Sequence, residues 1–224
     1  ADRDWSSDVC SSDLLYSYVS GAPTRMREAG GQSDTAGVFA ELSARHGPVT
    51  LTGGVRADRW WLSNGRLLER MRTTGAALRQ DIAPDRSGWA PTGRAGLAWA
   101  AGPVTLRTAA YIGWRLPTLN ELYRPFRVGA DATAANPTLQ PEKMRGAEIG
   151  ADFRPADGLV LRATAFTNRL RAAIGNVTLA NGPGTFPGVG FVSGAYRQRL
   201  NLDAVRSRGL ELDARFTQGD WSLS

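Results

Sequence analysis

Apolar and polar residues alternate with a period of two along much of this chain. The alternation is clearest in GVFAELSARH (37–46), VTLTGGVRADRW (49–60), GAEIGADFR (146–154) and GLELDARF (209–216). Successive side chains of a β-strand point to opposite faces, so this period predicts strands with one apolar and one polar face. The pattern predicts about nine strands, near residues 14–20, 34–46, 48–61, 92–101, 103–114, 143–154, 158–171, 204–217 and from 220 onward.

The connections between these strands fall into two lengths. Tight turns are expected at Gly47-Pro48, Gly102-Pro103, 155–158 and 218–220, whereas the long segments 62–91, 115–142 and 172–203 are rich in Gly, Pro, Asn and Arg. Compact soluble domains rarely contain several long structureless loops, but transmembrane barrels combine short periplasmic turns with long extracellular loops. We therefore expect an all-β fold, an antiparallel transmembrane β-barrel. We expect the barrel to be incomplete, because the strand count is odd and the last strand is cut short.

Three tryptophans bear on the choice between a barrel and a soluble fold. Trp60, Trp61 and Trp114 fall at the ends of predicted strands, where the aromatic girdle of a membrane barrel would lie. In a soluble β-sandwich, the alternative fold, the same rings would be core residues. The sandwich does not explain why one face of nearly every strand is charged, unless that face meets water. No apolar run approaches the roughly 18 residues of a membrane-spanning helix, which excludes a helical membrane protein.

The composition removes several classes of function. The net charge is +6, but the 27 basic residues, of which Lys143 is the only lysine, are spread along the chain without a basic run, so we expect no nucleic-acid binding. Cys10 and His46 are the only residues of their types, so no internal disulfide or Cys/His metal site can form, and His46 is expected to be a solvated residue at a strand end. No nucleophile or phosphate-loop motif is present. We expect no enzyme activity, no metal and no cofactor.

The first residues differ from the rest of the chain. SSD occurs twice, and DVCSSDL (8–14) resembles a translated sequencing-library adapter. We therefore expect residues 1–13 to be a non-native or disordered leader and residues 14–224 to be the barrel segment; an ordinary polar loop is the alternative. The N-terminus has neither the basic region nor the apolar core of a signal peptide. Because the chain stops at GDWSLS, within an alternating pattern, we expect a fragment at both ends.

The segment GWRLPTLNELYRPF (113–126) interrupts the strand pattern. Pro117 lacks the N–H that strand pairing needs, so it ends the preceding strand. Thr118 and Glu121 have the spacing of a capping box, which predicts a short helical turn over 118–123. Asn136-Pro137 and Gln140-Pro141 then favour extended or turn backbone before each proline. The next strand is expected to begin at about Lys143.

Three elements in order, WRLPTLNELYRPF (114–126), ANPTLQPE (135–142) and GAEIGADF (146–153), resemble the β-barrel signature of TonB-dependent outer-membrane receptors of the siderophore and cobalamin type. The general sequence pattern of this family extends over residues 14–224. The resemblance implies a barrel of about 22 strands filled by an N-terminal plug. It also implies active import of a scarce nutrient, such as a ferric siderophore or cobalamin, energised through TonB. The plug, the energy-coupling box and the final strand are not in this sequence, so we expect import to belong to the parent protein.

The resemblance also implies a location and partners. The location is the outer membrane of a Gram-negative bacterium, where lipid and lipopolysaccharide surround the barrel. The partners are a metal chelate or similar small nutrient and, through the plug, the TonB complex. A passive porin or adhesin barrel without a plug is the second hypothesis, and a soluble β-sandwich binding module is the third. A plug-like domain upstream in the intact gene would favour the first hypothesis, and solubility without detergent would favour the third.

Five residues are expected to contact the ligand. Tyr111 is in register with Thr105 and Arg107 on the polar face, so it should face the lumen near the outer rim. Arginine and tyrosine suit anionic ferric chelates through charge-assisted hydrogen bonds and aromatic contact. The expected contacts are Tyr111, Arg115, Tyr123, Arg124 and Arg127. In the alternative interpretation Arg115, Pro117, Glu121 and Asn136 only shape the loop, and exposed arginines meet lipopolysaccharide phosphates. The motif residues are Trp114, Pro117, Thr118, Glu121, Leu122, Asn136, Pro137, Pro141, Glu142 and Glu148.

Overall fold

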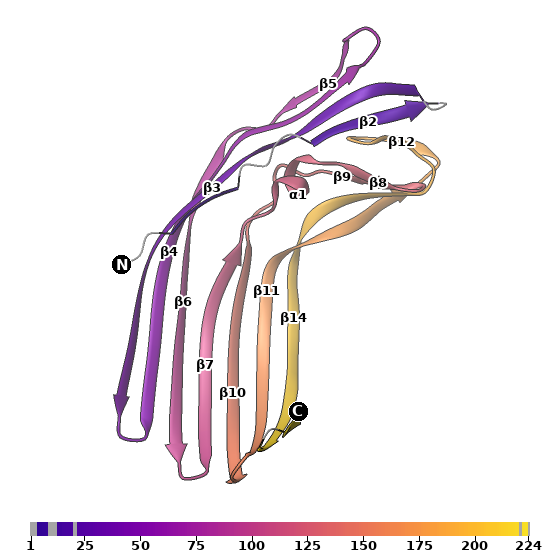
Figure 1. Cartoon of the computed structure of the whole chain (residues 1–224). Coiled ribbons are helices and arrows are strands. Elements are labelled where there is room, and N and C mark those ends of the chain that lie inside the picture. The colour runs from indigo at the N-terminus through magenta and orange to yellow at the C-terminus, as the bar shows by residue number, and fades with distance from the viewer. Residues whose placement is uncertain (1–3, 9–12, 20–21, 220, 224) are drawn as a thin grey trace.

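Seven long antiparallel strands lie side by side and form one curved wall (Figure 1). The computed structural model describes residues 4–8, 13–19, 22–219 and 221–223. Each strand of the wall is paired with the next strand of the wall in the chain, so the topology is a meander. The strands are β3 (Ala22–His46), β4 (Val49–Met71), β6 (Arg86–Ala101), β7 (Val104–Arg115), β10 (Glu142–Ala156), β11 (Leu159–Asn181) and β14 (Ala195–Gln218). Within the described ranges β3 and β14 do not pair, so the sheet is open, as expected for an incomplete barrel.

Tight turns join these strands at one end of the wall, which we call the turn side. Residues 47–48, 102–103 and 157–158 connect successive strands. Gly47, Gly102 and Gly158 all have positive φ, at 56°, 61° and 77°, which glycine adopts without the steric cost of a Cβ. The short β15 (Trp221–Leu223) pairs with the end of β14. The turns predicted at Gly47-Pro48, Gly102-Pro103 and 155–158 are confirmed, whereas Asp220 of the fourth predicted turn lies outside the described residues.

The opposite end, the loop side, differs from the sequence expectation. Segments 62–91 and 172–203 were expected to be structureless loops, and this prediction is wrong. In these segments β4 continues to Met71 and pairs with β5 (Ala77–Ile82), and β11 pairs with β14 as far as Asn181. The physical reason is that paired strands satisfy backbone N–H and C=O groups that a long coil would leave to solvent. Two further strands, β12 (Gly184–Phe186) and β13 (Gly190–Val192), form a separate hairpin.

The N-terminal strands lie at the edge of the sheet. The strand predicted at 14–20 corresponds to β2 (Asp13–Val19), which pairs only with the loop-side part of β3 and is not a strand of the wall. β1 (Asp4–Asp8) pairs with β3 at Ser33–Gly37. Residues 1–3 and 9–12 of the expected leader lie outside the described residues, and its non-native origin stays a prediction.

The two faces of the wall differ in chemistry. One face carries large exposed apolar side chains, among them Val55, Ile149 and Leu212. The other face carries charged pairs such as Arg107 with Asp152 and Arg94 with Glu41. We call the first face outward and the second inward, because a membrane barrel is apolar outside and polar inside. No described element covers the outward face, which contradicts the β-sandwich alternative.

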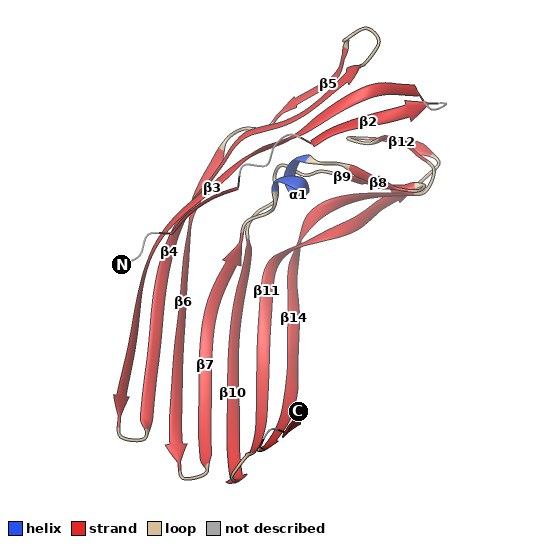
Figure 2. Ribbon diagram, viewed as in Figure 1, coloured by secondary structure: helices blue, strands red, loops and turns tan. Residues whose placement is uncertain are grey.

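A segment of 26 residues, 116–141, folds against the inward face near the loop side; we call it the α1 loop. It contains α1 (Leu119–Tyr123), β8 (Phe126–Val128) and β9 (Asp131–Ala134), and α1 is the one helix among the described residues (Figure 2). The buried cluster between the loop and the wall consists of Trp60, Leu62, Ala90, Leu119, Leu122, Tyr123 and Leu139. No helix in the described ranges is long and apolar enough to cross a membrane.

The expected girdle position of two tryptophans is wrong. Trp60 is 7% exposed and belongs to the buried cluster under α1. The Trp114 indole N–H donates to Asp58 Oδ2 at 3.0 Å on the inward face. The Trp114 side chain also packs against the same cluster. Trp61 is 39% exposed and faces outward, as expected. Adjacent residues of a strand face opposite sides, so Trp60 and Trp61 could not both lie in one girdle.

Candidate functional site

The α1 helix is held in place by a capping box. Glu121 N–H donates to Thr118 Oγ1 at 3.2 Å, and Thr118 N–H donates back to Glu121 Oε2 at 2.8 Å. These bonds satisfy backbone donors at the helix start that have no intrahelical partner. β7 ends at Arg115, and Pro117 is fully buried just before the helix. The predicted helical turn and its cap are confirmed.

Arg115 joins the α1 loop to the strand that follows it. Its Nε donates to Glu142 Oε2 at 2.6 Å, and its two Nη atoms donate to Glu121 at 2.9 and 3.1 Å. Glu142 Oε1 also accepts the Ile174 N–H at 2.6 Å. Burial opposes ionisation of Glu121, but hydrogen bonds from Arg115 and Thr118 outweigh it, so the pKa of Glu121 lies below its ordinary value. Two carboxylates thus neutralise the Arg115 charge.

Hydrogen bonds from two strands of the wall, β14 and β6, fix the rest of the α1 loop. From β14, Arg199 Nη1 donates to the carbonyls of Asn120 at 2.7 Å and Arg124 at 3.0 Å. The Asn136 side chain donates to the Arg199 carbonyl at 2.9 Å. From β6, Arg86 donates to the carbonyls of Pro137 at 2.7 Å and Leu139 at 2.9 Å. The loop is therefore tied across the concave side of the wall.

Below the α1 loop, a row of directly opposed residues crosses all seven wall strands on the inward face. The strand register aligns Glu41, Gly54, Arg94, Tyr111, Gly146, Asn168 and Ser207. Each glycine in the row lies between two residues whose side chains form a hydrogen bond over its backbone, on the inward face. Arg94 Nη2 lies 2.6 Å from Glu41 Oε1 across Gly54, and Tyr111 Oη donates to Asn168 Oδ1 at 2.9 Å across Gly146.

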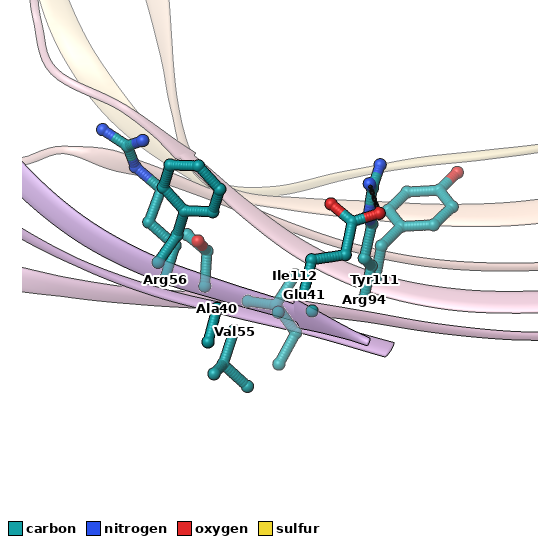
Figure 3. Close-up of a pocket in the computed structure, with 11 residues that line it drawn as sticks. Ala40, Glu41, Val55, Arg56, Arg94, Tyr111 and Ile112 are labelled. Atoms are coloured by element: carbon teal, nitrogen blue, oxygen red, sulfur yellow. Dashed lines mark hydrogen bonds and ion pairs between the residues drawn. The ribbon is translucent and has the colours of Figure 1, made fainter. Parts of the chain in front are cut away.

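Figure 3 shows this part of the inward face. Glu41, Arg56, Arg94 and Tyr111 project from one side of the sheet, whereas Val55 and Ile112 project from the other side. An open cavity of about 330 Å³ lies here and is bordered by residues of β3, β4, β6 and β7. Arg56 Nε pairs with Asp58 at 2.7 Å, next to this cavity. The cavity offers arginine and tyrosine donors with a carboxylate near each arginine.

Of the five residues expected to contact the ligand, one borders the cavity and four are buried or bonded elsewhere. Tyr111 lies on the inward wall, borders the cavity and shares its face with Arg107, as expected. Tyr123 is 4% exposed, and its ring lies where a side chain on Gly65 would be. Burial raises the pKa of the Tyr123 phenol above its ordinary value. Arg127 donates to the carbonyls of Val189 and Phe191, and the Arg124 carbonyl accepts from Arg199. Arg115 is paired with two carboxylates.

The motif residues gather around the α1 loop. Leu122 is fully buried in its core, and Asn136 Oδ1 accepts the Thr138 N–H at 3.0 Å in a side-chain turn that precedes Pro137. β10 begins directly after Pro141, at Glu142. Glu148 is the exception, because it lies lower on the inward wall, between Tyr111 and the turn side. Its backbone carbonyl accepts from Thr108 Oγ1 at 2.9 Å.

Sequence reasoning missed Glu41, Arg56, Arg94 and Asn168. Their alternation marked them as inward residues, but only the strand register brings them beside Tyr111. The sequence did contain a partial signal for these contacts. Gly54 and Gly146 lie at inward positions of their strands, where a missing side chain leaves room for residues of the two neighbouring strands to bond. Within the ranges that the structure describes, no cluster of His, Cys, Asp and Glu has metal-binding geometry.

A family model described as "TonB dependent receptor-like, beta-barrel" matches residues 2–224. This chain belongs to the TonB-dependent receptor β-barrel family. Members of this family are outer-membrane transport receptors of Gram-negative bacteria and not enzymes. No curated protein sequence matched the chain.

Solved TonB-dependent receptor structures have a similar fold. The Serratia marcescens hemophore receptor HasR, solved with its hemophore HasA and heme, has a TM-score of 0.66 and 21% identity over 96% of this chain and 38% of HasR. The copper transporter OprC has a TM-score of 0.65 and 20% identity over 93% of this chain and 31% of OprC. The Yersinia pestis ferric yersiniabactin receptor FyuA has a TM-score of 0.55 and 15% identity, with coverages of 89% and 27%. The chain therefore spans between about a quarter and two-fifths of these structures.

Proposed function

We propose that this chain forms part of the barrel of an outer-membrane receptor that imports a metal chelate with energy supplied through TonB. The observation that carries the proposal is the inward row in which Arg94 and Tyr111 border a cavity at the concave side of an outward-apolar wall. Arginine and tyrosine bind the oxygen-rich anionic surface of chelates such as ferric siderophores. HasR, OprC and FyuA are named for heme, copper and a ferric siderophore, which all contain a metal.

The pair formed by Arg94 and Glu41 suits a reversible contact. Their side chains are 66% and 49% exposed, so water screens the pair, and exposed ion pairs contribute about 1 kcal/mol or less to stability. Arg94 can therefore leave Glu41 and bind a ligand oxygen at little cost. Arg56 is more firmly held, because its partner Asp58 is almost fully buried and also accepts from Trp114. We assign ligand contact to Arg94 and Tyr111 first, and to Arg56 second.

Of the residues expected from sequence, Arg115, Tyr123, Arg124 and Arg127 fit a loop-shaping function better. Arg115 is engaged by two carboxylates, Tyr123 is buried, and Arg127 is bonded to two backbone carbonyls. A ligand would have to displace these bonds to reach the side chains. In this proposal the four residues hold the α1 loop above the cavity.

Transport is tested with the intact receptor that carries this segment. Uptake is measured in cells lacking their own receptors, with ferric citrate, a ferric catecholate, a ferric hydroxamate, heme and cobalamin as probes. We expect uptake of one class, and its loss when TonB is deleted. Uptake that continues without TonB would instead assign the barrel to the passive pores.

Two opposed substitutions then test the ligand contact. Arg94→Met should weaken binding of the transported chelate about tenfold or more, because it removes a charge-assisted hydrogen bond. Glu41→Gln frees Arg94 and should leave binding equal or stronger. The control is Arg45→Met on the same inward face of β3 at the turn side, which should have no effect. Equal losses from Arg94→Met and Arg45→Met would contradict the assignment.

A further inference from the structure

The outward face of β10, β11 and β14 carries a cluster of exposed cations near the loop side. The register places Arg145, Arg169 and Arg206 directly opposite one another on three adjacent strands. Lys143 and Arg171 oppose each other one step nearer the loop side, and Arg208 lies one step nearer the turn side. We call these six residues the cationic patch: Lys143, Arg145, Arg169, Arg171, Arg206 and Arg208. All six are exposed.

The described residues supply no counter-charge to the patch. Within the described part of the chain, none of its six side chains forms an ion pair or a hydrogen bond. The acidic residues of these strands, such as Glu148, Asp152 and Glu211, are in register with inward residues and so point to the other face. Like charges on directly opposed strand positions repel one another. Water screens this repulsion in part because all six side chains are exposed, and a bound anion would relieve the rest.

The patch borders an apolar surface. On the same face, directly toward the turn side, lie Ile149, Leu210 and Leu212, which are 65%, 66% and 75% exposed. From Phe153 to Arg145 the strand advances about 27 Å at about 3.4 Å per residue. At a tilt of roughly 40° this corresponds to about 20 Å of height, close to the ~25 Å apolar band of outer-membrane barrels. The cations thus lie at the upper boundary of the membrane-facing surface.

We propose that the cationic patch binds the phosphate groups of lipopolysaccharide in the outer leaflet, with the acyl chains on the apolar surface below. The long connections place the patch on the extracellular side, where the outer leaflet lies. Arginine binds phosphate through paired N–H donors, and three adjacent arginines can share one or two phosphates. Phosphates sit at headgroup level above acyl chains, which matches cations above Ile149 and Leu210. This inference goes beyond transport and depends only on the outer-membrane location.

The test measures lipid binding by the intact receptor carrying this segment, in detergent. The receptor is freed of bound lipid and titrated with diphosphorylated lipid A under native mass spectrometry. Lipid A from which both phosphates have been removed serves as the matched ligand. We expect the phosphorylated form to bind at least tenfold more tightly, because its phosphates meet the patch. Equal binding of the two forms would overturn the proposal, and this comparison needs no substitution.

Substitutions then locate the site. Arg145→Gln, Arg169→Gln and Arg206→Gln together should weaken lipid A binding about a hundredfold, because each arginine near an anionic lipid surface contributes about a factor of five. The control is the set Arg45→Gln, Arg70→Gln and Arg215→Gln, which removes the same charge from exposed positions outside the patch. Equal weakening by both sets would show that net charge alone drives binding, and the proposal would fail. Replacement of the three patch arginines by lysine keeps the charge but not the paired donors, so it should weaken binding less than glutamine does, and binding by this variant would show that the barrel still folds. Because no transport is measured, failure here is separate from failure of the proposed function.

Discussion

The Tyr111 phenol donates a hydrogen bond to Asn168 Oδ1 at 2.9 Å, across the backbone of Gly146. The two residues are 57 positions apart in the chain and lie on β7 and β11, with β10 between them. A Cβ on Gly146 would lie 2.2 Å from Asn168 Oδ1 and 2.4 Å from the Tyr111 ring. The glycine therefore makes room for a bond that sets the direction of the Tyr111 ring beside the cavity.

Gly146→Ala should break this bond and destabilise the barrel by about 1–3 kcal/mol, the usual cost of overpacking. The free energy of unfolding is measured by urea titration of the intact receptor in lipid bilayers. Gly113→Ala is the control, because a Cβ at Gly113 would have no neighbour within 4 Å and its φ is not positive. If both substitutions lower the free energy of unfolding equally, the bond between Tyr111 and Asn168 does not depend on a glycine at position 146.

Trp60 and Trp61 allow a comparison of the two faces at adjacent positions. Trp60→Ala should cost about 3–5 kcal/mol, because it leaves a cavity in the buried cluster under α1. Trp61→Ala should cost about 1 kcal/mol or less, because its ring faces outward and makes no core contact. Unfolding in the same bilayers compares them. A larger cost for Trp61→Ala would reverse the assignment of the faces.

The capping carboxylate Glu121 should make stability depend on pH. Its folded-state pKa is lowered, so its stabilisation is present above the ordinary pKa of about 4.5 and is lost as pH falls through the lowered value. Glu121→Gln should therefore reduce stability at pH 7 and reduce the further loss on acidification below pH 4.5. Glu148→Gln is the control, because no side-chain bond to Glu148 occurs in the described structure. A pH profile unchanged by Glu121→Gln would contradict the proposed charge interaction with Arg115.

Arg199 should control how firmly the α1 loop is held. Burial lowers the pKa of the guanidinium, yet Arg199 still donates to three carbonyls near the end of α1. All three bonds come from Nη1, and the guanidinium also lies over the Phe126 ring at 4.9 Å. A lysine ammonium lacks this planar group, so Arg199→Lys should cost about 1.5–3 kcal/mol of local stability. Hydrogen exchange of peptides from residues 116–141 should become more than tenfold faster. Arg215→Lys on the same strand should leave this exchange unchanged, and equal acceleration would contradict the anchoring function.

The local features of the fold could be predicted from sequence, and its long-range contacts could not. The capping box of Thr118 and Glu121 was predictable because the two residues are three positions apart and need only a helical turn. The turns at Gly47 and Gly102 were predictable because a hairpin demands positive φ at one of two residues. The extension of β4 to Met71 was not, because its loop-side half has no clean alternation and is a strand through pairing with β3 and β5.

The candidate site shows the same division. Tyr111 could be placed on the inward face because alternation alone assigns the faces of β7. Its neighbours Arg94 and Asn168 depend on the register of three other strand pairs, which no local pattern contains. The other four residues proposed as ligand contacts, Arg115, Tyr123, Arg124 and Arg127, were chosen by residue type. Packing of the α1 loop against the wall decides which of their side chains remain accessible.

The sequence by itself determined an all-β wall, its tight turns, the capped helix and the family, because each depends on period-two alternation or on short motifs. The tertiary structure decided that Trp60 and Trp114 turn inward, that Arg94 pairs with Glu41 beside Tyr111, and that Arg145, Arg169 and Arg206 form a row. The physical reason is register. A shift of one residue between two strands would move every side chain to the opposite face, so these neighbours exist only once the strands have paired.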